Sequence, residues 1–277
     1  MLKIFRRIRN VFSGNRFFNF NGVNNKLIID KYNLNLLWLF AFSKFKIKGN
    51  NNVIIFRGNF RLKHYFNIIK SLKLYIYGDN NLIDIEFPMR FDAVLIGLQK
   101  DNNSFKIKET IHPIRDARFF VEDGGSVSIG KNSELKNRGL HVVVNNGYKN
   151  KPKLVIGDNV FIAKDAIIRT SDGHSLIDPI SKIAINEPED VIIGNNVWIT
   201  SRCTILKGSH IPDNSVVGAC SLVNKKFTEP NVVIAGVPAK VIRENICWDF
   251  RNFGSYMSHY ESLKESINGW KVHIYYW

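Results

Sequence analysis

The stretch IGNNVW ITSRCT ILKGSH IPDNSV VGACSL VNKKFT, residues 193–228, divides into hexads that each begin with an aliphatic residue. The same spacing runs through IGDNVF IAKDAI IRTSDG, residues 156–173. The aliphatic first positions are Ile156, Ile162, Ile168, Ile193, Ile199, Ile205, Ile211, Val217 and Val223. A period of six residues suits neither an α-helix nor a simple alternating strand. It is typical of a parallel β-helix, in which a short strand and a turn repeat along the chain.

The other hexad positions fit such a solenoid. The fifth position is small or valine in most hexads: Val160, Ala166, Val197, Cys203, Ser209, Ser215 and Ser221. Glycine and asparagine recur at the expected corners, where their backbones adopt positive φ at low cost. We therefore predict that each aliphatic residue points inward and stacks on its equivalent in the adjacent coils.

Weaker copies of the motif extend toward the N-terminus. Each joins an aliphatic residue, a glycine, a polar corner and a second aliphatic residue: IKGNNNVI (47–54), IYGDNNLI (76–83) and SIGKNSEL (128–135). We interpret residues 46–153 as irregular coils of the same solenoid. Two segments, near 61–73 and 99–116, are expected to interrupt them.

The remaining segments complete the predicted organisation. Residues 154–243 are expected to form the regular coils, with a loop over 175–191. Residues 1–45 resemble a basic helical cap or attachment. Residues 244–277 lose the repeat and become rich in aromatic residues, and we expect them to contain a helix that packs against the end of the solenoid.

Composition limits the class of protein. The chain has 277 residues and 45% hydrophobic content, as expected for a soluble globular protein with a substantial core. Its three cysteines form no CxxC pair, and their odd number argues against a disulfide framework, so a reducing, cytoplasmic setting is expected. The longest apolar run, LLWLFAF at 36–42, is far shorter than the roughly 18–20 residues of a membrane-spanning helix. The N-terminus also lacks the long apolar core of a signal peptide.

Positive charge is concentrated at one end of the chain. Residues 1–78 contain 15 Lys and Arg but one acid, whereas the remainder contains 24 basic and 23 acidic residues. Biased codon usage is one explanation, and a surface for an anionic membrane, glycan or nucleic acid is another. The start, MLKIFRRIRNVF (1–12), has the pattern of a short basic amphipathic helix, which either makes peripheral contact with a membrane or packs on its own domain.

The regular phase breaks in RTSDGHSLID, residues 169–178. His174 occupies the aliphatic position of the next hexad, and the phase returns at Ile193, 19 residues later rather than 18. Pro179 and Pro188 favour an extruded loop over a helix. We interpret the break as the feature that frees the imidazole from the core.

Three stretches carry a family resemblance: SDGHSLID, VIIGNNVWITSRCTILKGSHIPDNSVVGACSLVNKKF and VVIAGVPAKVIRE. Through them, residues 155–243 resemble the hexapeptide-repeat acyltransferases, in particular bacterial sugar O-acetyltransferases of the maltose/galactoside and capsular-polysaccharide type. The resemblance implies an all-β solenoid wound as a left-handed parallel β-helix. It also implies a homotrimer with acetyl-CoA, but no metal, bound between neighbouring coils.

The resemblance makes His174 the catalytic histidine. A neutral imidazole suits the reaction, because a sugar hydroxyl must lose its proton as it attacks a thioester. Asp172 and Glu187 are alternative partners for orienting the ring, and a backbone carbonyl is a third. Trp198 is implied to line the acceptor or thioester site, with packing at a corner as the other interpretation.

The resemblance also implies a set of residues that bind acetyl-CoA. Thr200 stands beside the expected thioester contact, where many relatives have a glycine. Ala219 and Ser221 are small enough to let the pantetheine arm approach, or else they pack in the interior. The residues implied to border the adenine and phosphates are Gly236, Pro238, Ala239, Lys240 and Arg243.

The expected function is O-acetyl transfer from acetyl-CoA to a sugar hydroxyl of a bacterial surface polysaccharide or its precursor. Alternative acceptors are a small free sugar, a nucleotide sugar, or an amino sugar that is N-acetylated. A non-enzymatic, glycan-binding solenoid is the rival class. A γ-type carbonic anhydrase needs closely spaced histidine ligands, which the separation of His141, His174 and His210 excludes. No nucleic-acid recognition motif is visible.

Overall fold

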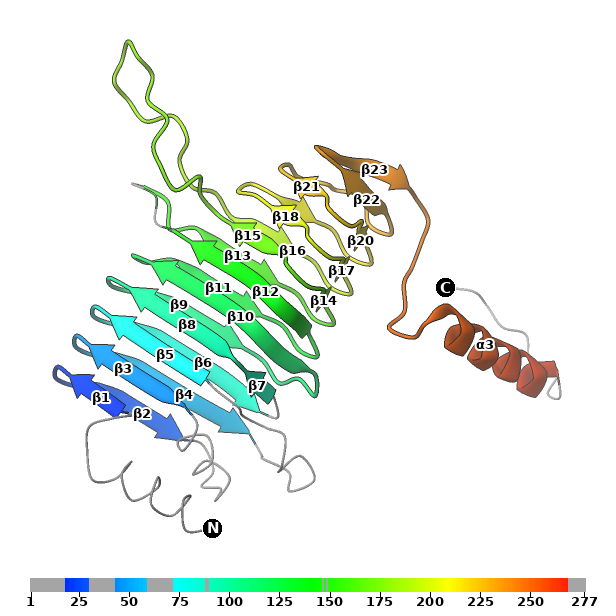
Figure 1. Cartoon of the computed structure of the whole chain (residues 1–277), viewed down its shortest axis with the longest axis horizontal. Coiled ribbons are helices and arrows are strands. Elements are labelled where there is room, and N and C mark those ends of the chain that lie inside the picture. Colours follow the sequence, from blue (N-terminus) through cyan, green and yellow to red (C-terminus); the bar gives the residue numbers. More distant parts are fainter. Residues whose placement is uncertain are drawn as a thin grey trace. The chain divides into compact units, whose positions relative to one another are not determined.

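The computed structural model describes residues 18–29, 43–58, 72–87, 90–145, 147 and 149–268 (Figure 1). By its internal contacts the chain forms two units, residues 1–246 and 247–277. The first unit is a solenoid of parallel strands, as the hexads predict, and it is wound as a left-handed β-helix.

The strands lie on three faces of the solenoid. Face 1 consists of β1 (Phe18–Asn21), β3 (Lys44–Lys48), β5 (Leu72–Tyr77), β8 (Val94–Gln99), the later parts of β10 (Pro113–Glu122) and β12 (Glu134–Val144), β15 (Ile167–Arg169), β18 (Thr204–Ile205) and β21 (Leu222–Val223). Face 2 consists of β2 (Lys26–Ile29), β4 (Val53–Gly58), β6 (Leu82–Phe87), β9 (Ser104–Ile107), β11 (Ser126–Ile129), β13 (Lys153–Ile156), β16 (Val191–Ile193) and β19 (His210–Ile211). Face 3 holds β7 (Arg90–Asp92), the starts of β10 and β12, β14 (Phe161–Ile162), β17 (Trp198–Ile199), β20 (Val216–Val217) and β22 (Val233–Gly236).

The aliphatic positions of the hexads stack in register. On face 3, Ile162 pairs with Ile199, and Ile199 pairs with Val217. The equivalent positions of faces 1 and 2 form matching columns, and all nine hexad positions are buried. The predicted inward stacking is therefore confirmed.

The N-terminal coils are held at one corner by a ladder of buried asparagines. The side chain of Asn81 donates hydrogen bonds to Asn52 Oδ1 and to the Lys100 carbonyl, both at 3.0 Å. Its own Oδ1 accepts from the Asn103 backbone and side-chain nitrogens, each at 2.9 Å. The residue before it, Asn80, adopts a φ of 57° at the turn. Each asparagine thus satisfies backbone groups of the adjacent coil that would otherwise be buried without partners.

Two expectations for the N-terminal half need correction. The helical cap over residues 1–45 is not supported, because β1 and β2 form the first coil there, and the rest of that range lies outside the described residues. The sequence signal was NGVNNKLI (21–28), which has the same polar corner as later coils. The stretch near 99–116 contains β9 and the start of β10, so it continues the solenoid rather than interrupting it. Most of the other expected interruption, 61–73, is not described.

The C-terminal elements differ from the coils. After the last parallel strands, β23 (Ala239–Arg243) pairs antiparallel with β22 and covers its free edge. The expected C-terminal helix is present as α3 (Phe253–Asn268) in the second unit. No helix of the described residues is long and apolar enough to span a membrane. The predicted amphipathic helix at residues 1–12 falls outside them.

The asparagine ladder is testable by a single substitution. Asn81→Ala should lower the free energy of unfolding by about 1–3 kcal/mol, because it leaves buried hydrogen-bonding groups of two adjacent coils unsatisfied. The matched control is Asn80→Gly, which keeps the positive φ and should change stability by no more than about 0.5 kcal/mol. Urea denaturation followed by circular dichroism measures both. Equal losses in the two variants would contradict a structural role for the ladder.

Candidate active site

The break in the repeat forms an arm between β15 and β16. Residues 170–190 leave the solenoid, run outward and return, as Figure 1 shows. The arm is a narrow antiparallel loop, in which Ile185 N donates to the Leu176 carbonyl at 2.8 Å and Asp178 N donates to the Ile183 carbonyl at 2.9 Å. The predicted extruded loop is therefore present.

His174 lies at the base of this arm, at the corner between faces 1 and 2, and it is exposed. It lines a pocket of about 520 Å³. Other lining residues come from neighbouring coils and from both sides of the arm, including Lys100, Glu122, Asn145, Lys149, Asp172, Asn186 and Glu187. The histidine is thus outside the core and beside a cavity that a ligand can enter.

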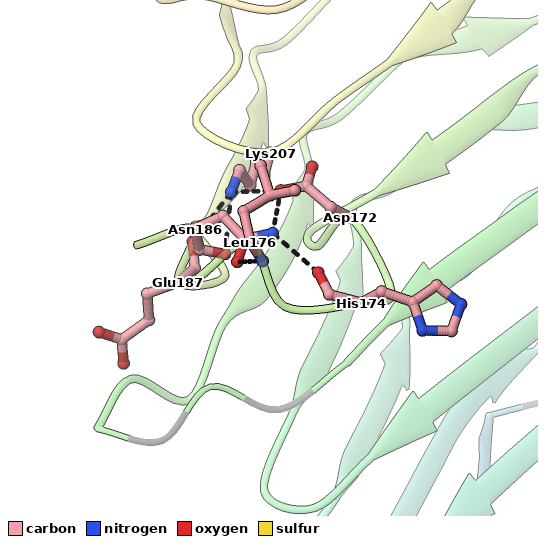
Figure 2. Close-up of polar contacts among 6 residues, drawn as sticks. All are labelled: Asp172, His174, Leu176, Asn186, Glu187 and Lys207. Carbon is pink, nitrogen blue, oxygen red and sulfur yellow. Dashed lines mark hydrogen bonds and ion pairs between the residues drawn. The ribbon is translucent and has the colours of Figure 1, made fainter. Parts of the chain in front are cut away.

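A polar cluster behind His174 holds the turn in place (Figure 2). The Asn186 side chain donates to the His174 carbonyl and to Asp172 Oδ2, both at 2.8 Å. Asn186 Oδ1 accepts from the Leu176 backbone N–H at 2.8 Å. Lys207 Nζ forms an ion pair with Asp172 at 2.7 Å and donates to the Asn186 carbonyl at 3.0 Å. These contacts fix the backbone on both sides of His174.

The two acids proposed as partners of His174 have other contacts. The hydrogen bond from Lys207, followed by that from Asn186, lowers the pKa of Asp172. Glu187 accepts from the backbone N–H groups of Lys149 and Asn150 at 2.9 and 3.0 Å, and these bonds lower its pKa. Figure 2 shows the imidazole directed away from both carboxylates, and it makes no hydrogen bond to any described residue. Asp172 is therefore linked to the backbone of His174 through Asn186 rather than to its ring.

The sequence interpretation missed Asn186 and Lys207. Lys207 had a usable signal, because it occupies the corner after β18, one coil beyond the corner that carries the arm. Asn186 had none, since its position depends on how the arm folds back.

Trp198 lies on a different face from His174. It belongs to β17 on face 3, between Phe161 of β14 and Val216 of β20. Its indole and the Phe161 ring lie 6.4 Å apart between centroids, with a 31° angle between planes. Within one chain, the solenoid therefore places Trp198 and His174 on separate parts of its surface.

The small residues expected near the cofactor separate into interior and surface positions. The Ser221 side chain is buried, donates to the Gly218 carbonyl and accepts from Gly236 N at 3.1 Å. Ala219 is exposed at the corner after β20. Thr200, at the equivalent corner one coil earlier, turns its hydroxyl to the Val217 carbonyl at 2.6 Å. Ser221 therefore packs in the interior, while Ala219 leaves the corner open.

The segment AGVPAKVIR forms the hairpin of β22 and β23. Gly236 has a φ of 107° and, with Pro238, lies in the exposed turn. Ala239 is buried, whereas Lys240 and Arg243 are exposed on β23. The Ser221 contact brings the hairpin turn next to the corner that carries Ala219.

Known acetyltransferases are similar to the chain in sequence and in fold. No family model matches the chain. The galactoside O-acetyltransferase of Escherichia coli (strain K12) is 46% identical over 91 residues, which are 33% of this chain and 44% of the relative. The polysialic acid O-acetyltransferase of Neisseria meningitidis is 29% identical over 199 residues, 72% of this chain and 89% of the relative. The crystal structure of the polysialic acid-specific acetyltransferase NeuO matches 90% of this chain and 97% of its own, with a TM-score of 0.62 and 25% identity.

The chain is therefore similar in sequence and in fold to hexapeptide-repeat acetyltransferases. The fold match extends well beyond the regular hexads, because NeuO aligns with 90% of the chain. The alignment with the galactoside enzyme is more local and spans less than half of that relative. The described residues contain no cluster of three or more His, Cys, Asp or Glu residues that could hold a metal ion.

The Lys207 contact makes a measurable prediction about Asp172. In Lys207→Met the pKa of Asp172 should rise toward its ordinary value, because the largest cause of its lowering is removed. With Lys207 present, the carboxylate should stay ionised, and the ion pair intact, until the pH falls through the lowered pKa. Carbon-13 NMR titration of the Asp172 carboxyl measures the difference. Lys164→Met, at an exposed corner residue, is the control and should leave the titration unchanged.

Proposed function

We propose that the protein is an O-acetyltransferase that moves an acetyl group from acetyl-CoA to a sugar hydroxyl of a bacterial surface polysaccharide or its precursor. The observation that carries this proposal is His174, which is released from the solenoid core and lines the pocket at the base of the arm. The names of the relatives support the chemistry, since they include galactoside, polysialic acid and lipopolysaccharide O-acetyltransferases.

In the proposed reaction, His174 is the general base. Its imidazole accepts the proton of the sugar hydroxyl as the oxygen attacks the thioester carbonyl carbon. The new C–O bond forms, the C–S bond of the tetrahedral intermediate breaks, and the proton passes to the departing CoA thiolate. No covalent enzyme intermediate is needed when donor and acceptor are bound side by side. Asp172, Asn186 and Lys207 are positioning residues in this scheme, because they hold the backbone that presents the imidazole.

The donor site is proposed along the corner that carries Ala219 and the adjacent hairpin. This surface combines an open corner with the exposed cations Lys240 and Arg243, which suit the phosphates of acetyl-CoA. It lies on face 3 and its edge with face 1, whereas His174 lies at the other edge of face 1.

In a homotrimer, the proposed donor site of one copy could lie beside His174 of another. Two observations favour such an assembly of copies. The arm exposes four isoleucines, Ile177, Ile180, Ile183 and Ile185, at 58%, 91%, 64% and 68%. A polar environment does not stabilise such a run of apolar side chains, so a partner surface is expected to cover it. Trp198 and His174 also lie on separate faces of one chain, and a neighbouring copy would allow them to share a site.

The base assignment predicts a specific loss of activity. His174→Ala should lower turnover by about 10²–10⁴-fold, the usual contribution of general acid–base catalysis. The fold and acetyl-CoA affinity should persist, since the imidazole makes no hydrogen bond to the described part of the chain. His210→Gln is the control, because His210 lies on β19 and does not line this pocket. Retained turnover in His174→Ala would contradict the assignment.

An acceptor panel tests the function as a whole. Acetyl-CoA is offered with anionic polysaccharides, neutral polysaccharides, free sugars, amino sugars and nucleotide sugars, and released CoA is measured with a thiol reagent. We expect release with a polysaccharide or its precursor. Release with a small sugar alone would favour the alternative acceptor class. Glycan binding with no CoA release from any acceptor would favour the non-enzymatic class and overturn the proposal.

A further inference from the structure

The outward side chains of face 1 form ladders that cross the N-terminal coils. Because the strands pair in parallel, residues in register stand one above another, about 4.8 Å apart. One ladder runs through Lys46, Tyr75, Gly97, Phe120 and Val143. Its neighbours run through Lys44, Lys73, Leu95, Arg118 and His141 on one side and through Lys48, Tyr77, Gln99 and Glu122 on the other.

The charge on these ladders is almost entirely positive. From β3 to β12 the outward positions carry five cations and one acid, Glu122, with the cations at Lys44, Lys46, Lys48, Lys73 and Arg118. None of the five forms an ion pair with a carboxylate of the described residues. On β12 the pKa of His141 is lowered by partial burial and then by the charges of Arg118 and Arg169.

Half-buried aromatic rings lie between the cations. Tyr75 and Tyr77 project from β5, and Phe120 projects from β10. Lys46 Nζ lies 5.7 Å from the centre of the Tyr77 ring. Gly97 separates Tyr75 from Phe120 in the ladder and is buried, because the Phe120 ring lies against it: a Cβ at Gly97 would be 3.3 Å from that ring. Flat rings beside cations suit a sugar, whose apolar ring face stacks on an aromatic while its carboxylate meets a cation.

The ladders lead to the pocket of His174. Glu122 on β10 is the last residue of the ladder that begins at Lys48, and it lines that pocket. Asn145, directly after β12, also lines it. The Asn145 side chain donates to Glu122 at 3.3 Å, which joins the two coils at this edge. The cationic face is therefore continuous with the cavity beside the proposed general base.

We propose that face 1 from β3 to β12 is a binding track for an extended anionic glycan chain, which lies across the coils and delivers one sugar to the pocket of His174. The four steps between these strands give a track of about 19 Å, long enough for several sugar units. This inference rests on the proposed function and adds where the polymer binds and why its charge matters.

A second copy of the chain is a poorer occupant of this face. Assembly through face 1 would bring the same five cations of each copy close together, and their repulsion opposes association. The outward residues of face 3 in the regular coils, Phe161, Trp198, Val216 and Val233, are uncharged and fit a protein partner better. Charge complementarity thus favours a polyanion on face 1.

The test uses polysialic acid and its disaccharide as probes, with the full-length protein. In Lys46→Gln/Lys73→Gln the Kd for fluorescently labelled polysialic acid and the KM for the polymer should each rise about tenfold, with kcat and the disaccharide KM nearly unchanged. High salt should remove most of the difference, because exposed charges are screened. The matched control, Lys26→Gln/Lys106→Gln, removes two exposed cations from face 2 and should leave polymer binding unchanged.

A third variant separates stacking from charge. Tyr77→Leu keeps an apolar side chain but removes the ring, and it should weaken polymer binding at low and high salt alike. Equal effects of the face 1 and face 2 variants would overturn the track, as would failure of the wild-type protein to bind the polymer at low salt. A changed oligomeric state of Lys46→Gln/Lys73→Gln in light scattering would instead assign face 1 to a copy of the chain. Absence of acetyl transfer with polymer binding intact would count against the proposed function and leave the track standing.

Discussion

The other features of this structure depend on the stacking of one aliphatic residue in every six. Each such residue pairs with its equivalent in at least one neighbouring coil, so the core is a set of columns rather than a cluster. A polar residue in a column must leave it or find a buried partner. His174 leaves the column. It occupies the place of the next aliphatic residue, at the point where the chain leaves the coil as an arm. The same constraint that builds the solenoid thus brings an imidazole to the surface beside a pocket.

The predictability of each feature follows from how locally it is determined. Columns and corners depend on residues six positions apart, so the hexads predicted the solenoid, the arm and the exposure of His174. The first coil was mistaken for part of a helical cap, because Phe18–Ile29 contains one polar corner and no second hexad to confirm the phase. The contacts of Asp172 and Glu187 were beyond sequence analysis, since Lys207 and the backbone of residues 149–150 reach them from other coils.

The cluster behind His174 illustrates how an exposed loop can present a side chain in a defined position. The His174 imidazole makes no hydrogen bond to the described residues, so its placement depends on its backbone. Asn186 bonds that backbone at His174 and at Leu176, and the Lys207 ion pair holds Asn186 through Asp172. Because Lys207 belongs to the next coil, the rigid solenoid stabilises the base of the arm. Asp172 therefore contributes to the placement of His174 through backbone contacts rather than by touching its ring.

The positive charge of the N-terminal half gains an explanation from strand register. In sequence, Lys44, Lys46 and Lys48 alternate with buried residues and give only the pattern of a half-buried strand. Parallel pairing places them beside Tyr75, Tyr77 and Arg118 on one face, which sequence distance would not suggest. Face 2 mixes both signs in these coils, because Lys26, Arg57 and Lys106 point outward together with Asp84 and Glu86. Face 1 from β3 to β12 instead carries five cations and one acid. This excess of cations on one face, rather than the total charge, is what favours an anionic partner for face 1.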